Sequence, residues 1–112
     1  MIKNALRSLA LSTTILFAIQ PAFADQRDFR VFNKTSVDIK HLYVSPSGAK
    51  SWEEDVLGRD TLSSGDSTKI YFQGNAATCR YDIRAEFDDG DVVEDYKINL
   101  CTTGSYTFRE GK

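Results

Sequence analysis

The sequence predicts an all-β fold, a small antiparallel β-sandwich of about six or seven strands with one disulfide. Short runs rich in aromatic and β-branched residues alternate with turns of Gly, Asn, Asp and Ser. No helical stripe of apolar residues is long enough to stand alone. The only two cysteines, Cys79 and Cys101, bracket a segment with the pattern of a hairpin.

The first 24 residues have the features of a secretory signal peptide. A Lys and an Arg come first, an apolar run over 9–19 is too short to span a bilayer, and an A-x-A motif ends at Ala24. We therefore predict cleavage after Ala24 and a periplasmic or secreted protein with no stable membrane insertion afterwards. Residues 25–112 are then short enough to form a single β domain.

The expected strands follow one another along that domain. They are DFRVFN, VDIKHLYVS, TKIYF after the turn SSGDS, the two arms of the hairpin between the cysteines, and SYTF. Each is rich in the aromatic and β-branched residues that fit a half-buried pleated surface. Only KSWEEDVLG has helical character, because Ser51 could cap and Gly58 could end a single turn.

The hairpin carries the strongest local signal, since Asp-Gly at 89–90 separates two alternating runs. A two-residue turn there would place Ile83 opposite Tyr96 and Cys79 opposite Leu100. One face of the hairpin is then almost wholly apolar, which favours this register because a slip of one residue exchanges the two faces.

The same register leaves Cys101 one position beyond the partner of Cys79, with the two sulfurs on opposite faces. A bulge in the second strand, departure of the chain from the ladder at Leu100, or two free thiols would each resolve the conflict. Two cysteines in a small exported domain normally pair, so we predict a Cys79–Cys101 disulfide. It would stabilise the fold by roughly 3 kcal/mol in the chain-entropy model. The spacing is far from the C-x-x-C of catalytic dithiols, so we expect a structural bond.

Acidic residues gather at the hairpin turn. Asp88, Asp89 and Asp91 are the only weak candidates for a metal site. An EF-hand loop with its glycine at Gly90 would need acids at positions 85, 87 and 89, and the first two are Ala85 and Phe87, so that motif is absent. A weak calcium-binding loop is one alternative, and solvated acids that discourage edge pairing are the other. We expect no metal and no cofactor. With 16 carboxylates and no basic stripe, the domain has no electrostatic reason to bind nucleic acid.

His41 is the single histidine, and it shares a strand face with Ile39 and Tyr43. A small hydrolase or lyase could use it as a base if an acid such as Asp38 or Glu53 lay within reach. A packed, half-buried side chain is the other interpretation. Because the chain offers so few bases and nucleophile pairs, we assign no catalytic residue and do not expect an enzyme.

The loop that contains Pro46, Trp52 and Leu57 predicts a contact surface. A tryptophan in a polar, turn-rich stretch suits a binding hot spot if its ring is exposed. Alternatively, Trp52 plugs an open end of the sandwich. The favoured function is therefore an exported binding or interaction module, whose partner is an unknown protein or small ligand of the cell envelope.

The series LYVSPSG, a Trp followed by DVLG, then CRYDIRAEFDDG and NLC resembles a family of small exported bacterial proteins of unknown function. The resemblance covers nearly all of the mature chain and implies a compact exported β domain. Some members of that family carry the name argininosuccinate lyase. Argininosuccinate lyases are large, mainly helical tetramers, and so short a β-rich chain cannot build their shared active site. The resemblance therefore implies no catalytic residues.

Overall fold

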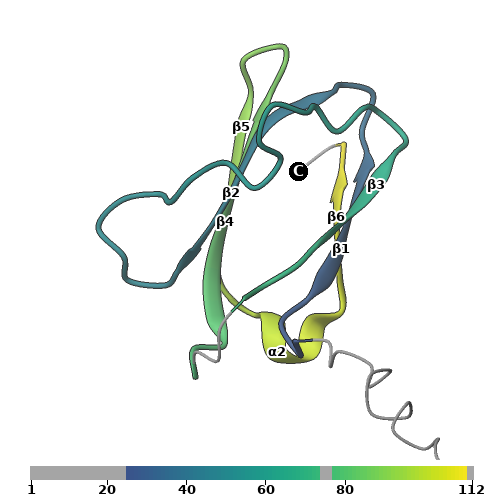
Figure 1. Cartoon of the computed structure of the whole chain (residues 1–112). Helices are drawn as coiled ribbons and strands as arrows, with labels where there is room; N and C mark the ends of the chain where they lie inside the picture. The colour runs from purple at the N-terminus through teal and green to yellow at the C-terminus, as the bar shows by residue number, and fades with distance from the viewer. Residues whose placement is uncertain (1–24, 74–76, 111–112) are drawn as a thin grey trace, which may run out of the picture.

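The computed structural model describes residues 25–73 and 77–110 and confirms the all-β class (Figure 1). The predicted signal peptide, residues 1–24, lies outside the described residues. Two three-stranded sheets face each other, in the orders β3-β1-β6 and β2-β4-β5. In the described part, no helix has the length and apolar character needed to cross a membrane. The elements are β1 (Phe29–Lys34), β2 (Ile39–Pro46), β3 (Ser67–Ile70), β4 (Arg80–Phe87), β5 (Val92–Asn99), α2 (Leu100–Thr103) and β6 (Ser105–Arg109).

In the first sheet, the central strand β1 pairs antiparallel with β3 and parallel with β6. The parallel pair is the one departure from the expected antiparallel arrangement among the described strands. Alternate residues of β1 point inward, and the last of them is the fully buried Asn33. Its Nδ2 donates to the carbonyls of Val37 and Leu62 at 2.9 and 3.0 Å, and its Oδ1 accepts from Thr35. A buried amide satisfied in this way holds the turn between β1 and β2.

In the second sheet, β4 lies between β2 and β5, and its burial alternates as the sequence predicts. The apolar residues of β4 face the other sheet, while its charged residues face outward. The buried core between the sheets consists of Phe29, Val31, Ile39, Leu42, Val44, Leu62, Ile70, Tyr81, Ile83, Ala85, Phe87, Leu100 and Phe108.

At its turn, the β4–β5 hairpin differs from the predicted register. The amide of Phe87 donates to the carbonyl of Asp91 at 2.8 Å, which closes a turn one residue longer than the expected two. Ile83 consequently lies opposite Asp95 instead of Tyr96. The prediction was wrong here because Asp-Gly fits both the two-residue turn and the longer turn that ends in a left-handed glycine.

A bulge in β5 then restores the predicted register toward the cysteines. Tyr96 and Lys97 together lie opposite the single residue Asp82, and beyond them Tyr81 faces Ile98 as expected. Lys97 has φ 58°, in the left-handed region that non-glycine residues rarely adopt. Because the longer turn shifts this part of β5 by one residue, Tyr96 points to solvent, and it is 54% exposed instead of lying on the apolar face.

The predicted disulfide joins Cys79 and Cys101, whose Cα atoms lie 5.2 Å apart. The amide of Leu100 still donates to the carbonyl of Cys79 at 2.8 Å, and the chain then leaves the ladder as α2. Asn99 caps this turn by accepting from the amide of Cys101, and Gly104 with φ 74° ends it. Of the three predicted resolutions of the conflict, departure of the chain from the ladder at Leu100 is the one that joins the sulfurs.

The long connection from β2 to β3 contains no helix over 50–58, contrary to the helical turn suggested by the sequence. Asp55 instead forms a bridge with Tyr43 at the edge of β2, and Leu62 forms a second with Ile39. The connection follows the β2 edge before it crosses to β3 in the opposite sheet (Figure 1).

Candidate binding site

The outer face of the β2-β4-β5 sheet carries aromatic and charged side chains in cross-strand rows. Tyr43 of β2 lies beside Arg84 of β4, and Arg84 lies beside Glu94 of β5. His41 lies two residues before Tyr43 in β2, opposite Glu86 of β4. Cross-strand neighbours at this spacing contact one another, so the face is a connected polar and aromatic surface.

A hollow of about 200 Å³ opens at the end of this face where the bulge lies. Three parts of the chain contribute to it: the end of β2, the loop that follows it, and the bulge of β5. Asp82 of β4 lies between them. The hollow is lined by Ser45, Pro46, Ala49, Lys50, Ser51, Trp52, Asp82 and Tyr96.

The loop side of the hollow is held by its own hydrogen bonds. The amide of Glu53 donates to the hydroxyl of Ser45 at 2.8 Å, and the amide of Ala49 donates to the carbonyl of Pro46 at 3.0 Å. The half-buried Trp52 ring lies with its centroid 6.5 Å from that of Tyr43. This distance is within the range of favourable aromatic pairs, so the indole rests against the sheet.

The opposite side of the hollow is held by a chain of charged hydrogen bonds. The hydroxyl of Tyr96 donates to Glu94, and Glu94 pairs with Arg84, whose Nε donates to Glu86 at 3.1 Å. The bond to Glu94 raises the pKa of Tyr96, and the same bond, followed by the pair with Arg84, lowers the pKa of Glu94. These contacts fix the Tyr96 ring although much of it is exposed.

Two polar atoms in the hollow have capacity left. Oδ1 of Asp82 accepts from the hydroxyl of Ser47 at 2.7 Å and from the amide of Lys97 at 2.9 Å. Neither its Oδ2 nor the hydroxyl proton of Ser45 bonds to any residue in 25–73 or 77–110. Ser45 is 2% exposed, so its hydroxyl is a buried donor at the hollow. Such unused groups orient ligands in small-molecule sites.

The structure brings together two of the three residues of the predicted contact surface. Pro46 and Trp52 line the hollow, whereas Leu57 packs against the core. Trp52 is half-buried, so it neither protrudes fully nor fills the interior. The sequence reasoning missed Asp82 and Tyr96. Asp82 lies on the face of β4 away from the apolar one, as the alternation of this strand implies, but the register shift that brings Tyr96 to the same face has no simple sequence signal.

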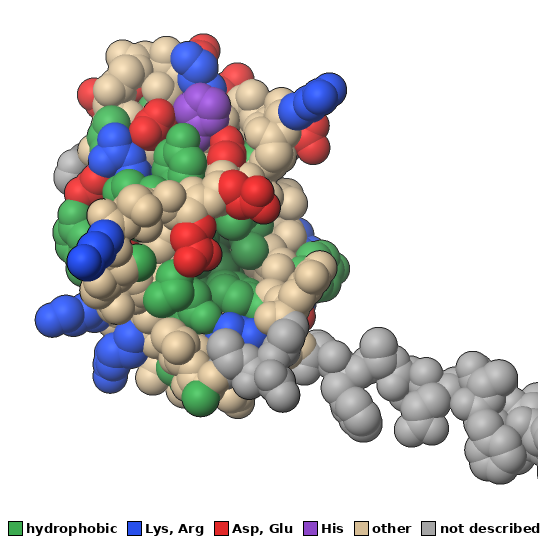
Figure 2. All heavy atoms as spheres, turned by 60° about the vertical axis from the view of Figure 1, so that its left-hand side comes forward, with side chains coloured by type: hydrophobic (Ala, Val, Ile, Leu, Met, Phe, Trp, Pro, Cys, Tyr) green, Lys and Arg blue, Asp and Glu red, His purple; other side chains and the backbone are tan. Residues whose placement is uncertain are grey.

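His41 has a carboxylate partner, which is neither Asp38 nor Glu53. Its Nδ1 lies 2.8 Å from Oδ2 of Asp55, and the imidazole is 40% exposed. Oδ1 of Asp55 accepts from the amides of Leu42 and Leu57. The Asp55 carboxylate therefore ties the long connection to the edge of β2. This structural role accounts for the contact between His41 and Asp55 without a catalytic one. The histidine is visible on the surface in Figure 2, near several acidic side chains.

The acids of the hairpin turn are solvated. Asp88, Asp89 and Asp91 are all exposed, and Oδ1 of Asp89 accepts from the amide of Asp91 at 3.0 Å. Across residues 25–73 and 77–110, no group of three or more His, Cys, Asp or Glu side chains is arranged to hold a metal ion.

A second hollow, of about 450 Å³, lies where the edges of β5 and β6 face each other. Its floor includes the rings of Phe87, Tyr106 and Phe108, which pack edge to face. The hydroxyl of Tyr106 donates to Asp95 at 2.8 Å, and burial followed by this bond raises the pKa of Tyr106. The inward-facing Asp95 is thereby satisfied, and the hollow is the open side of the core.

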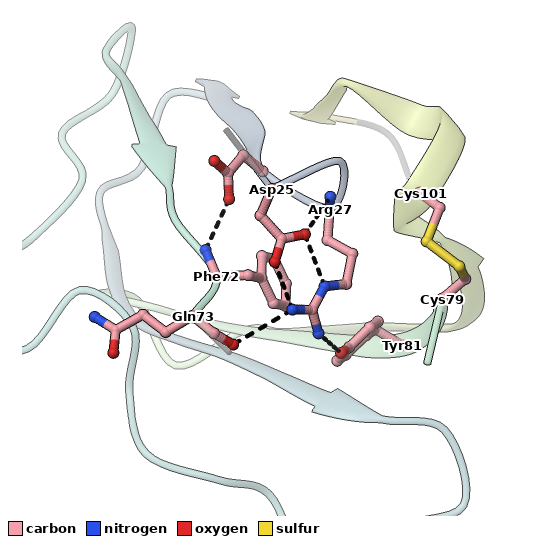
Figure 3. Close-up of polar contacts among 8 residues, drawn as sticks. Asp25, Arg27, Phe72, Gln73, Cys79, Tyr81 and Cys101 are labelled. Carbon is pink, nitrogen blue, oxygen red and sulfur yellow. Dashed lines mark hydrogen bonds and ion pairs between the residues drawn. A yellow bond between two sulfur atoms is a disulfide. The ribbon is translucent and has the colours of Figure 1, made fainter. Parts of the chain in front are cut away.

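A buried cluster closes the end of the sandwich at which β4 begins, on the inner face of the sheet (Figure 3). Arg27 is 4% exposed, and its Nε and one terminal nitrogen donate to the two carboxylate oxygens of Asp25 at 2.9 and 2.6 Å. The other terminal nitrogen donates to the Tyr81 hydroxyl at 2.7 Å. The guanidinium carbon lies 4.7 Å from the centroid of the Phe72 ring. Arg27 is thus fully engaged by its neighbours.

Neither a scan of protein-family models nor a search of curated proteins gives a match. Among solved structures, the chain is similar to an NMR structure of a protein from Eubacterium rectale. The TM-score is 0.49, the sequence identity is 17%, and the alignment covers 73% of each chain.

Proposed function

We propose that the protein is an exported binding module of the periplasm or the extracellular space, and that the hollow beside Trp52 and Tyr96 is its contact site. One observation carries the assignment of the site: two aromatic rings from separate segments flank a concavity that contains Asp82. Aromatic walls with a few fixed polar groups are the usual composition of a ligand site.

Export is supported by the charged start, the short apolar run and the A-x-A motif that ends at Ala24. The Cys79–Cys101 disulfide agrees with it, since such bonds persist in oxidising compartments. The outer face also suits a contact surface, because Tyr43, Arg84 and Glu94 form a connected row of aromatic and charged side chains on it.

The test is capture from an envelope extract of the source cells by the immobilised, oxidised protein, with retained protein and carbohydrate both analysed. We expect Trp52→Ala to lose a component that the wild type retains. Tyr71→Ala is the matched control, because Tyr71 is 72% exposed but does not line the hollow. Identical retention by the wild type and Trp52→Ala would rule out this site.

A further inference from the structure

We propose that the hollow between Trp52 and Tyr96 binds one neutral hexose or N-acetylhexosamine residue of a saccharide. This inference rests on the proposed function and adds the chemical class of the ligand. The argument combines the size of the hollow, its aromatic walls, its balance of charge and its unused hydrogen-bonding groups.

The size limits the ligand. A volume of about 200 Å³ is below the range of roughly 300–1,000 Å³ that holds drug-sized molecules. It therefore suits a single small ring. The exposed Lys50, Ser51 and Tyr96 leave the hollow open to solvent, so neighbouring units of a chain can extend out of it.

The aromatic walls suit the apolar side of such a ring. Trp52 and Tyr96 come from different segments and line the same hollow, and Pro46 adds a third flat apolar surface. The electron-rich face of an aromatic ring attracts weakly positive C–H groups, which a pyranose ring presents on its faces. Trp52 rests against Tyr43 and Tyr96 is held by Glu94, so little order is lost when a ligand binds.

The charges of the hollow favour a neutral ligand. Lys50 and Asp82 are the two ionised groups that line it. A cation would be attracted by Asp82 and the rings but repelled by Lys50, and an anion would be repelled by Asp82. The aromatic cages that bind quaternary ammonium groups lack such an opposing positive charge.

The unused polar atoms match hydroxyl groups. The buried Ser45 hydroxyl has a proton to donate, and Oδ2 of Asp82 has lone pairs to accept with. A sugar hydroxyl donates and accepts at once, so adjacent hydroxyls can satisfy both side chains. An apolar ligand of the same size would leave both of them unpaired.

The test uses the fluorescence of Trp52, which is the only tryptophan in the chain and therefore reports on this hollow alone. The probes are cellohexaose, mannohexaose and the hexamer of N-acetylglucosamine, with tetramethylammonium and polygalacturonate as charged comparisons. We expect at least one neutral oligosaccharide to change the emission saturably with millimolar or tighter affinity. Tyr96→Ala and Ser45→Ala should weaken that binding about tenfold, and Tyr71→Ala should not change it.

A larger response to tetramethylammonium or polygalacturonate than to any neutral oligosaccharide would overturn the ligand class. So would no response to the panel while Trp52-dependent capture from the envelope extract persists, and in that case the binding function stands. Loss of both would reject the proposed function together with the saccharide.

Discussion

Near the start of β4, the two faces of the second sheet carry similar side chains and use them in opposite ways. On the inner face, Arg27 and Asp25 are enclosed with Phe72 and Tyr81, and their hydrogen-bonding groups are engaged inside the chain. On the outer face, charged and aromatic groups surround a hollow in which two polar atoms are left over. Enclosed groups whose hydrogen bonds are all made stabilise the fold, whereas groups with spare hydrogen-bonding capacity are available to a ligand.

The largest expected effect is the loss of the Arg27 cluster. Arg27→Ala leaves the Asp25 carboxylate and the Tyr81 hydroxyl without their partner and opens a void beside Phe72. We expect the free energy of unfolding of the oxidised protein to fall by about 3 kcal/mol. Denaturant titration measures it.

Arg59→Ala, at an exposed position, is the control and should change the same free energy by less than about 0.5 kcal/mol. Equal effects of the two variants would show that the cluster adds no stability, and the contrast between the two faces of the sheet would fail.

The sequence predicted much of the enclosed framework because its signals are local. Alternation in β4 and the Asp-Gly turn predict the hairpin, and two cysteines in a chain that begins with the pattern of a signal peptide predict their own pairing. Nothing local marks Arg27 as buried, since its partners Tyr81 and Gln73 are distant in sequence. The longer turn and the bulge are equally hard to predict, because the apolar face of the hairpin favours a single uninterrupted register. Sequence reasoning therefore found Pro46 and Trp52 but missed the opposite wall of the hollow.

An intermediate effect on stability is expected from Asp25, the carboxylate partner of Arg27. The hydrogen bonds from Arg27 lower the pKa of Asp25 to about 2, against an ordinary value of about 4. A carboxyl whose pKa is lower in the folded state stabilises the protein above its unfolded pKa, and that contribution is lost as the pH falls through its folded pKa. Asp25→Asn should therefore lower the thermal midpoint near neutral pH, and the deficit should shrink between about pH 4 and pH 2.

Thermal unfolding followed by circular dichroism across this pH range measures that deficit. Asp60→Asn, at an exposed position in the long connection, serves as the control and should show no such convergence. A deficit for Asp25→Asn that stays constant down to pH 2 would mean that the ion pair does not distinguish the inner face of the sheet from the outer one.

The smallest effect concerns the bulge of β5 at Tyr96 and Lys97, which separates the part of the strand next to the turn from the part next to Cys101. Lys97 holds φ 58°, and its amide donates to Asp82, so its strained backbone keeps Tyr96 at the hollow. Lys97→Gly removes the steric cost of this conformation and should leave the unfolding free energy within about 0.5 kcal/mol of the wild type. Lys97→Val introduces a β-branched residue that resists a positive φ, and it should lower the same free energy by about 1 kcal/mol.

Hydrogen exchange of the amide at position 97 distinguishes the two variants. If the bulge determines where Tyr96 points, the amide stays protected with glycine and loses its protection with valine. Retained protection in both would mean that the contacts of Tyr96 with Glu94, and not the backbone at position 97, position this wall of the hollow.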